Sequence, residues 1–197
     1  MMKPTAEHIR ELLKKQQPAE LYTHTLDTAA CALELGYNYG CESAEMLNIE
    51  LGALLHDNCK HWFRGALLTA ALGLGYVLDD LEQKERTLLH ARVGALRLRR
   101  DFGIADKQVF DAVYFHTVGG PGMCRVARIV YCADKLETQR EFPGVKDIRA
   151  KASEGLAQLC LAVVTAGIEY LKRKHRLIHP ATIEFYNELS EETKGLG

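Results

Sequence analysis

Hydrophobic side chains recur at helical spacing along nearly the whole chain, and no stretch alternates between apolar and polar residues as a strand would. One apolar stripe runs from Leu21 to Leu35, and Gly36 after it predicts the end of a helix. Residues 147–174 predict one long helix, and residues 180–191 predict a last short one. The pattern therefore predicts an all-α fold with about eight helices or more.

The length and composition favour a single domain over residues 1–197, with the C-terminal helices of residues 147–191 packed on its core. Hydrophobic residues make up 47% of the chain and charged residues 26%, an ordinary balance for a globular protein. The long apolar helix could belong to this core or form the face of a homodimer, and the sequence leaves both open.

Charge and cysteine usage exclude several classes of protein. The net charge of −1 gives no reason to expect nucleic acid or an anionic membrane surface as a partner. No apolar run reaches the roughly 18–20 residues of a membrane span, and the N-terminus lacks the apolar stretch of a signal peptide. The six cysteines form no C-x-x-C pair. A cytoplasmic protein with reduced thiols is expected.

Residues of the kind that bind metals occur at five separated places, each at or beside an apolar stripe. They are His24, the adjacent pair His56 and Asp57, His90, His116 and Asp134. A lone histidine on a helix is more often an ordinary core or surface group. If six such residues converge, one common binding partner is the better explanation, because buried polar groups cost free energy unless they have a hydrogen-bond partner or a bound ion. Two divalent ions are the simplest reason, and imidazole and carboxylate ligands suit iron, manganese, cobalt or zinc.

The adjacent pair His56 and Asp57 is the strongest local signal. Neighbouring residues on a helix point about 100° apart, so both reach one site only where the helix ends or around two ions. Asp57 has two carboxylate oxygens and can bridge two metals. A two-metal site of this kind can activate a water molecule and hold a phosphoryl oxygen.

The neighbours of these residues produce a resemblance to the HD-domain metal-dependent phosphohydrolases. The resemblance rests on L-Y-T-H-T-L at residues 21–26, L-L-H-D at 54–57, L-H-A-R-V-G-A at 89–95, H-T at 116–117 and I-V-Y-C-A-D-K at 129–135. Two further blocks, G-P-G-M at 120–123 and R-E-F-P-G-V at 140–145, are similar to the YqeK branch specifically. The similarity covers about residues 5–175.

The resemblance implies a helical bundle around a bimetal site, with iron as the expected metal. It implies symmetrical cleavage of diadenosine tetraphosphate into two ADP by a metal-bridging hydroxide. It also assigns the metal ligands, which are His24, His56, Asp57, His90, His116 and Asp134. The expected ligands are therefore a dinucleoside polyphosphate or a nucleoside diphosphate.

A tetraphosphate carries several negative charges, so cations beside the metal ligands are candidates for binding it. Lys60 follows the histidine–aspartate pair by about one helical turn, whereas Lys135 and Arg140 follow Asp134. Ordinary solvation at a helix end is the alternative for each. His61 is near enough in sequence to line the same pocket. Asp57 and Lys60 are the candidate catalytic residues.

Two other functions stay open at this point. The chain could be an HD phosphohydrolase that acts on a nucleoside monophosphate or triphosphate, because the sequence does not fix the length of the pocket. It could also be a metal-occupied module that senses a nucleotide without turning it over.

Overall fold

The computed structural model describes residues 4–195, and every regular element within them is helical. This confirms the predicted all-α fold. The ends of the predicted single domain, residues 1–3 and 196–197, lie outside the described residues. The helices are α1 Ala6–Gln16, α2 Ala19–Asn38, α3 Ser43–Leu55, α4 Arg64–Gly73, α5 Asp80–Lys84, α6 Leu89–Phe102, α7 Lys107–Phe115, α8 Arg125–Leu136, α9 Val145–Ala150, α10 Leu156–Arg173 and α11 Pro180–Lys194, with short 3₁₀ turns η1 Arg86–Leu88 and η2 Lys151–Glu154.

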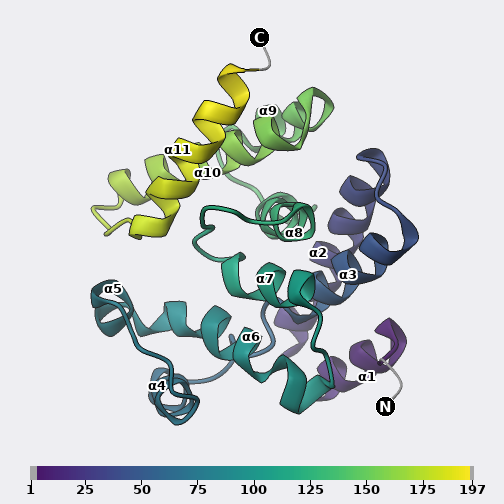
Figure 1. Ribbon diagram of the computed structural model, residues 1–197, viewed down its shortest axis with the longest axis vertical. Coiled ribbons are helices and arrows are strands. Elements are labelled where there is room, and N and C mark those ends of the chain that lie inside the picture. Colours follow the sequence, from purple (N-terminus) through teal and green to yellow (C-terminus); the bar gives the residue numbers. More distant parts are fainter. Residues whose placement is uncertain (1–3, 196–197) are drawn as a thin grey trace.

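Helix α8 lies at the centre of the molecule (Figure 1). It packs against α2, α3, α7 and α10. Its residues Ile129, Val130, Cys132 and Ala133 have no exposed surface. Burial of apolar surface is the main favourable term in folding, so these contacts fix the position of α8 within the bundle. Asp134 lies in the last turn of this helix and is held at the centre with it.

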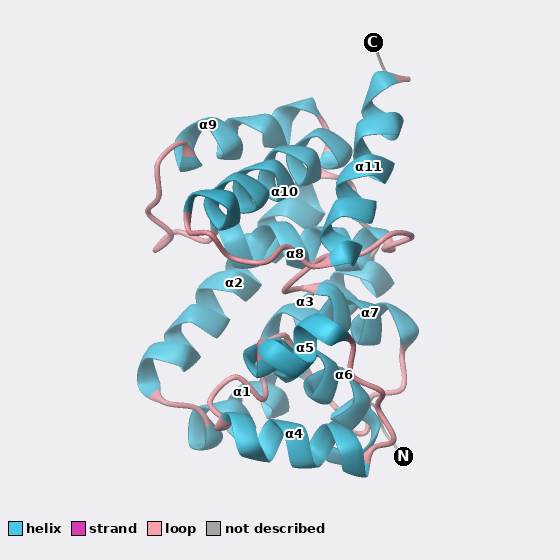
Figure 2. Cartoon of the chain, turned by 90° about the vertical axis from the view of Figure 1, so that its left-hand side faces the viewer, coloured by secondary structure: helices cyan, strands magenta, loops and turns pink. Residues whose placement is uncertain are grey.

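The remaining helices lie on two sides of α8. Helices α9, α10 and α11 lie on one side, and α1, α4, α5 and α6 lie on the other (Figure 2). A small second core joins α4 to α6 through Leu67, Ala71, Leu89 and Val93. This core holds the first turn of α6, which carries His90, against the body of the fold.

The glycine predicted to end the second helix lies inside it. Helix α2 continues past Gly36 to Asn38, and Gly40, with φ of 67°, follows its end. A Cβ at Gly36 would lie 2.8 Å from side-chain atoms of both Ile49 and Met46. The prediction of a helix end was therefore wrong, because this glycine allows α3 to approach α2 closely.

The single long helix predicted over residues 147–174 was also wrong in its continuity. The segment is divided into α9, η2 and α10, with Gly155 between η2 and α10. Gly155 has φ of 117° and ψ of 161°, a conformation that only glycine adopts readily. The apolar periodicity continues across this break, which is why the pattern alone did not indicate it. The last helix was predicted correctly and extends three residues further, to Lys194.

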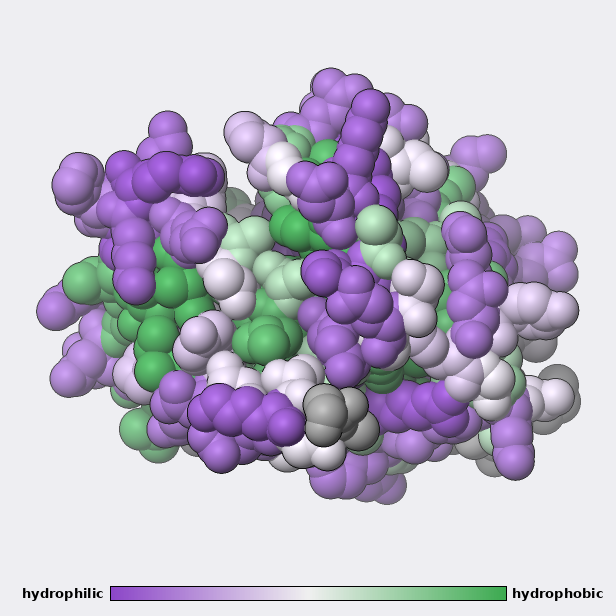
Figure 3. Space-filling view, turned by 90° about the horizontal axis from the view of Figure 1, so that it is seen from above, coloured by the Kyte–Doolittle hydropathy of each residue, from purple (hydrophilic) through white to green (hydrophobic). Residues whose placement is uncertain are grey.

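The apolar face of α10 is buried in the core of a single chain. Leu159, Cys160 and Val164 have no exposed surface, and α10 packs against both α8 and α11. On the face seen from above in Figure 3, which α9, α10 and α11 form, polar side chains surround patches of hydrophobic ones. The homodimer stays a prediction. Within residues 4–195, no helix has the length and apolar character required to cross a membrane.

Candidate metal centre

The end of α3 brings the two adjacent residues His56 and Asp57 to one place. The α-helix ends at Leu55, and His56 and Asp57 follow in a tight turn. In this turn the Asn58 amide donates to the Leu55 carbonyl oxygen at 3.2 Å. Both His56 and Asp57 have no exposed surface. The helix end therefore lets neighbouring side chains face the same site, as the sequence predicted.

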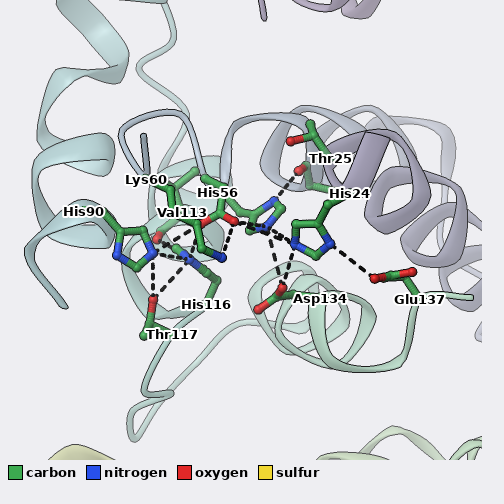
Figure 4. Close-up of polar contacts among 12 residues, drawn as sticks. His24, Thr25, His56, Lys60, His90, Val113, His116, Thr117, Asp134 and Glu137 are labelled. Carbon is green, nitrogen blue, oxygen red and sulfur yellow. Dashed lines mark hydrogen bonds and ion pairs between the residues drawn. The ribbon is translucent and has the colours of Figure 1, made fainter. Parts of the chain in front are cut away.

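The other four predicted ligands come from four more helices and converge on this pair (Figure 4). His24 lies in the first half of α2, and His90 is the second residue of α6. His116 follows the last residue of α7, and Asp134 lies in the last turn of α8. The structure thus brings together all six residues that the sequence indicated.

Three of the histidines have their ring orientation fixed by the backbone. His56, His90 and His116 each donate Nδ1–H to the carbonyl oxygen three residues earlier, at 2.6, 2.5 and 2.8 Å respectively. A carbonyl oxygen only accepts, so the proton is on Nδ1. The Nε2 atoms then point lone pairs into the centre, which is the arrangement that metal-binding histidines use.

One half of the centre consists of His24, His56 and Asp134. The Nε2 atoms of His24 and His56 lie 3.3 Å apart, and His24 Nε2 lies 3.1 Å from Asp134 Oδ1. Their ligand atoms all lie within 4.8 Å of one another.

The other half consists of Asp57, His90 and His116. The Nε2 atoms of His90 and His116 lie 3.0 Å apart, and Asp57 Oδ1 lies 3.2 Å from the first and 3.3 Å from the second. The second carboxylate oxygen, Asp57 Oδ2, lies 3.2 Å from His56 Nε2 in the first half. A single carboxylate therefore faces both halves.

These residues fit a pair of divalent cations. Asp57 Oδ1 is buried without a hydrogen-bond donor, although two imidazole nitrogens lie beside it. Such an orphaned acceptor is unfavourable in a protein interior. A cation between each group of nitrogen and oxygen lone pairs removes this cost, and the mixture of imidazole and carboxylate is compatible with divalent metals.

The charged side chains of the centre shift one another's pKa values even without a cation. Although burial by itself raises the pKa of Asp57, the surrounding histidines, His56 foremost, hold that pKa well below its ordinary value. Burial lowers the pKa of His56, but the carboxylates of Asp57 and Asp134 outweigh it and raise that pKa. Burial lowers the pKa of His116 to about 4. Burial also raises the pKa of Asp134, but Lys135 and the neighbouring histidines hold that pKa well below its ordinary value, so both carboxylates stay ionised and attract positive charge.

Three of the predicted phosphate-binding cations lie against the carboxylates of the centre. Lys60 Nζ lies 2.7 Å from Asp57 Oδ2, and Lys135 Nζ lies 2.6 Å from Asp134 Oδ2. Arg140 Nη2 lies 3.0 Å from Asp134 Oδ1. The centre is therefore surrounded by positive charge.

Comparisons with known proteins agree with this geometry. The family model described as "HD domain" matches residues 21–139, more than half of the chain. The chain belongs to the HD-domain family. A relative from Halalkalibacterium halodurans is 32% identical over 93% of this chain and 96% of its own length, and it is named "Bis(5'-nucleosyl)-tetraphosphatase, symmetrical". A relative from Bacillus subtilis with the same name is 31% identical over 90% of this chain and 93% of its own length.

A solved HD-domain structure has the same fold. It is described as a predicted HD superfamily hydrolase involved in NAD metabolism from Clostridium acetobutylicum. The two chains superimpose with a TM-score of 0.89 at 28% identity, covering 97% of this chain and 100% of the other. These relatives confirm the resemblance to the YqeK branch that the sequence motifs indicated.

Two residues of this HD-domain centre were missed by the sequence analysis. Glu137 is 2% exposed, and its Oε1 lies 3.3 Å from His24 Nδ1, so it orients the one histidine that lacks a backbone partner. Thr117 Oγ1 lies 3.1 Å from His116 Nε2 and 3.3 Å from His90 Nε2. Their positions in the sequence could have indicated them, because Thr117 directly follows a predicted ligand and Glu137 is one helical turn beyond Asp134.

His61 is exposed and is not among the residues that converge at the metal centre. It lines a surface hollow with Trp62, Arg97 and Asp101, and none of the six predicted ligands lines this hollow. Its ring packs edge-on against the ring of Trp62, with centroids 6.5 Å apart. A role for His61 in binding substrate stays a prediction.

Proposed function

We propose that this protein is a metal-dependent hydrolase that cleaves diadenosine tetraphosphate symmetrically into two ADP. The observation that carries the proposal is the position of Asp57, whose two carboxylate oxygens face two separate groups of ligand atoms. Full-length relatives named as symmetrical bis(5'-nucleosyl)-tetraphosphatases support the choice of substrate.

The proposed cofactor is a pair of divalent ions. His24, His56 and Asp134 would hold one ion, and His90 and His116 the other, with Asp57 between them. Iron is the proposed native metal, and manganese, cobalt and zinc accept the same donors. When bound, such a pair supplies a water molecule activated at neutral pH and an electrophile for phosphoryl oxygens.

The protein's own contribution is to hold the phosphate chain beside this centre. Lys60 presents its charge to Asp57, and Lys135 and Arg140 present theirs to Asp134. Charge-assisted hydrogen bonds from such groups to phosphate are short and strong. We assign substrate binding to these three residues, and a catalytic contribution to Asp57 and Lys60.

The position of cleavage follows from which phosphorus lies over the centre. Attack of water on one of the two central phosphorus atoms breaks the bond to the oxygen that joins them. The water oxygen then stays on one ADP, and the second ADP keeps the former bridging oxygen. The two products are therefore chemically identical, which distinguishes this reaction from cleavage near either end.

A panel of nucleotides tests the proposal against its alternatives. Purified protein loaded with iron, manganese, cobalt or zinc would be incubated with diadenosine tetraphosphate, ATP and AMP, and products separated by chromatography. The proposal predicts ADP as the product of diadenosine tetraphosphate and much slower turnover of the other two. Preferential cleavage of ATP or AMP would make the protein a different nucleotide hydrolase. Binding without turnover by every metal-loaded form would make it a sensor.

A further inference from the structure

A hollow of about 370 Å³ adjoins the metal centre, and of the residues that line it only Lys135 was among the predicted site residues. Its inner end is formed by Thr117 and Lys135. Thr117 Oγ1 lies within 3.3 Å of the Nε2 atoms of His90 and His116, and Lys135 Nζ lies 2.6 Å from Asp134. The hollow therefore extends outward from the centre, and its volume lies in the range of about 300–1,000 Å³ that is typical of small-molecule sites.

About half of the residues that line this hollow come from the C-terminal helices and the segment between them. Val163, Val164, Gly167 and Leu171 lie on one face of α10, and Leu177 lies in the segment that leads to α11. All of them lie beyond residue 139, where the match to the HD-domain model ends. The C-terminal helices thus complete a chamber with an aliphatic wall beside a metal centre that the HD-domain core already provides.

The outer rim of the hollow is polar and aromatic. Tyr170 of α10 is 51% exposed and lines the rim. Across from it, Arg176 Nη1 lies 3.3 Å from Glu85 Oε1, so this ion pair connects the α10–α11 segment to the segment before α6. An apolar chamber with an aromatic ring and a carboxylate at its edge suits a heterocyclic base and ribose hydroxyls better than it suits phosphate.

We propose that this chamber binds one nucleoside end of the substrate, with its phosphates directed past Lys135 and Thr117 to the metal centre. The inference rests on the proposed function, and it gives α10 and the segment before α11 a role in binding the nucleoside. Charge distribution supports this orientation. Of the two cations that line the chamber, Lys135 lies at the inner end and Arg176 at the outer rim, where it is paired with Glu85.

Gly167 offers a direct way to fill the chamber. It lies in the middle of α10 and lines the hollow, and a Cβ built there meets no other atom within 4 Å. The Cβ of a Gly167→Phe side chain therefore starts in open space, beside the hollow that its ring would fill. Gly73→Phe is the matched control, because Gly73 is also a helical glycine with open space around its Cβ but does not line the hollow.

The test compares a ligand that has a nucleoside with one that lacks it. Calorimetry would measure the binding of ADP and of inorganic pyrophosphate to metal-loaded wild-type protein, Gly167→Phe and Gly73→Phe. The proposal predicts that Gly167→Phe weakens ADP binding about tenfold or more, the loss expected when base stacking and apolar contacts are removed. Pyrophosphate binding should stay within about twofold of wild type, and Gly73→Phe should change neither ligand.

Unchanged ADP affinity in Gly167→Phe, or an equal loss of ADP and pyrophosphate binding, would overturn the proposal. Retained pyrophosphate binding shows that the variant is folded and metal-loaded. Tyr170→Ala provides a second variant that removes a surface side chain, and it should weaken ADP binding several-fold without affecting pyrophosphate. If wild-type protein fails to cleave diadenosine tetraphosphate, the proposed function fails. If it cleaves that substrate and Gly167→Phe binds ADP normally, only this inference fails.

Discussion

Replacement of Arg140 by alanine tests whether a cation beside the centre binds phosphate. Arg140 lies in the loop after α8, and its Nη2 lies 3.0 Å from Asp134 Oδ1 and 3.3 Å from His24 Nε2. Its Nε donates to the Asp134 carbonyl oxygen at 2.9 Å. The Arg149 side chain in turn donates to the Arg140 carbonyl oxygen at 3.0 Å. The guanidinium is therefore held against Asp134, and Arg149 holds the backbone of the loop that carries it.

The size of the effect follows from the kind of contact that is lost. A hydrogen bond that involves a charged group contributes about 1.5–3 kcal/mol. Since about 1.4 kcal/mol corresponds to one factor of ten, Arg140→Ala should lower kcat/KM for diadenosine tetraphosphate by about ten- to a hundredfold. The metal content should not change, because a protonated guanidinium has no lone pair to offer a metal.

The assay combines steady-state kinetics with metal analysis of the same preparation. Arg125→Ala is the matched control, since the Arg125 and Arg140 side chains are both 40% exposed and both pair with a carboxylate. Arg125 lies at the start of α8 and pairs with Glu45, away from the predicted ligands. Wild-type kcat/KM in Arg140→Ala, or an equal decrease in both variants, would refute phosphate binding by Arg140.

Three further predictions use other contacts of the described residues. His56→Ala removes a fully buried imidazole whose Nε2 lone pair faces the centre, and it should abolish most metal binding and activity while helix content, measured by circular dichroism, is kept; a fully metallated, active variant would contradict this. Lys60→Ala should lower kcat/KM by about ten- to a hundredfold at unchanged metal content, and unaltered kinetics would make Lys60 an ordinary solvated lysine. Gly155→Ala forces a side chain into a backbone conformation with φ of 117° and places its Cβ 2.9 Å from Gln158 Oε1, so urea unfolding should show a loss of about 1–3 kcal/mol. Gly167→Ala, at an unstrained helical position, should instead stabilise the protein by about 0.4–1 kcal/mol, and equal effects of the two substitutions would exclude backbone strain at residue 155.

The helix end at His56 and Asp57 could be predicted because it depends on a local rule, whereas the full set of ligands was implied by the family resemblance. The adjacent pair His56 and Asp57 required a helix end, and α3 ends at Leu55. Gly103, with φ of 68°, ends α6, and the Asp106 side chain caps α7; a glycine after an apolar stripe and an aspartate before one are local signals of the same kind.

The features that could not be predicted depend on contacts between distant segments. Gly36 looks like a helix end in sequence, but its role is decided by side chains of α3 that pack on it. The orientation of His24 depends on Glu137, 113 positions away in the chain. The chamber beside the centre is likewise built from segments on either side of residue 139, so no local pattern indicates it.

Hydrolysis in ¹⁸O-labelled water tests the central claim most directly. Metal-loaded protein would be incubated with diadenosine tetraphosphate, and mass spectrometry would follow the label in each nucleotide over time. The account predicts ADP as the only nucleotide product, with one labelled ADP for each unlabelled one, because water attacks a central phosphorus once per turnover. Formation of AMP and ATP in equal amounts, with the label on either, would contradict symmetrical cleavage at this centre.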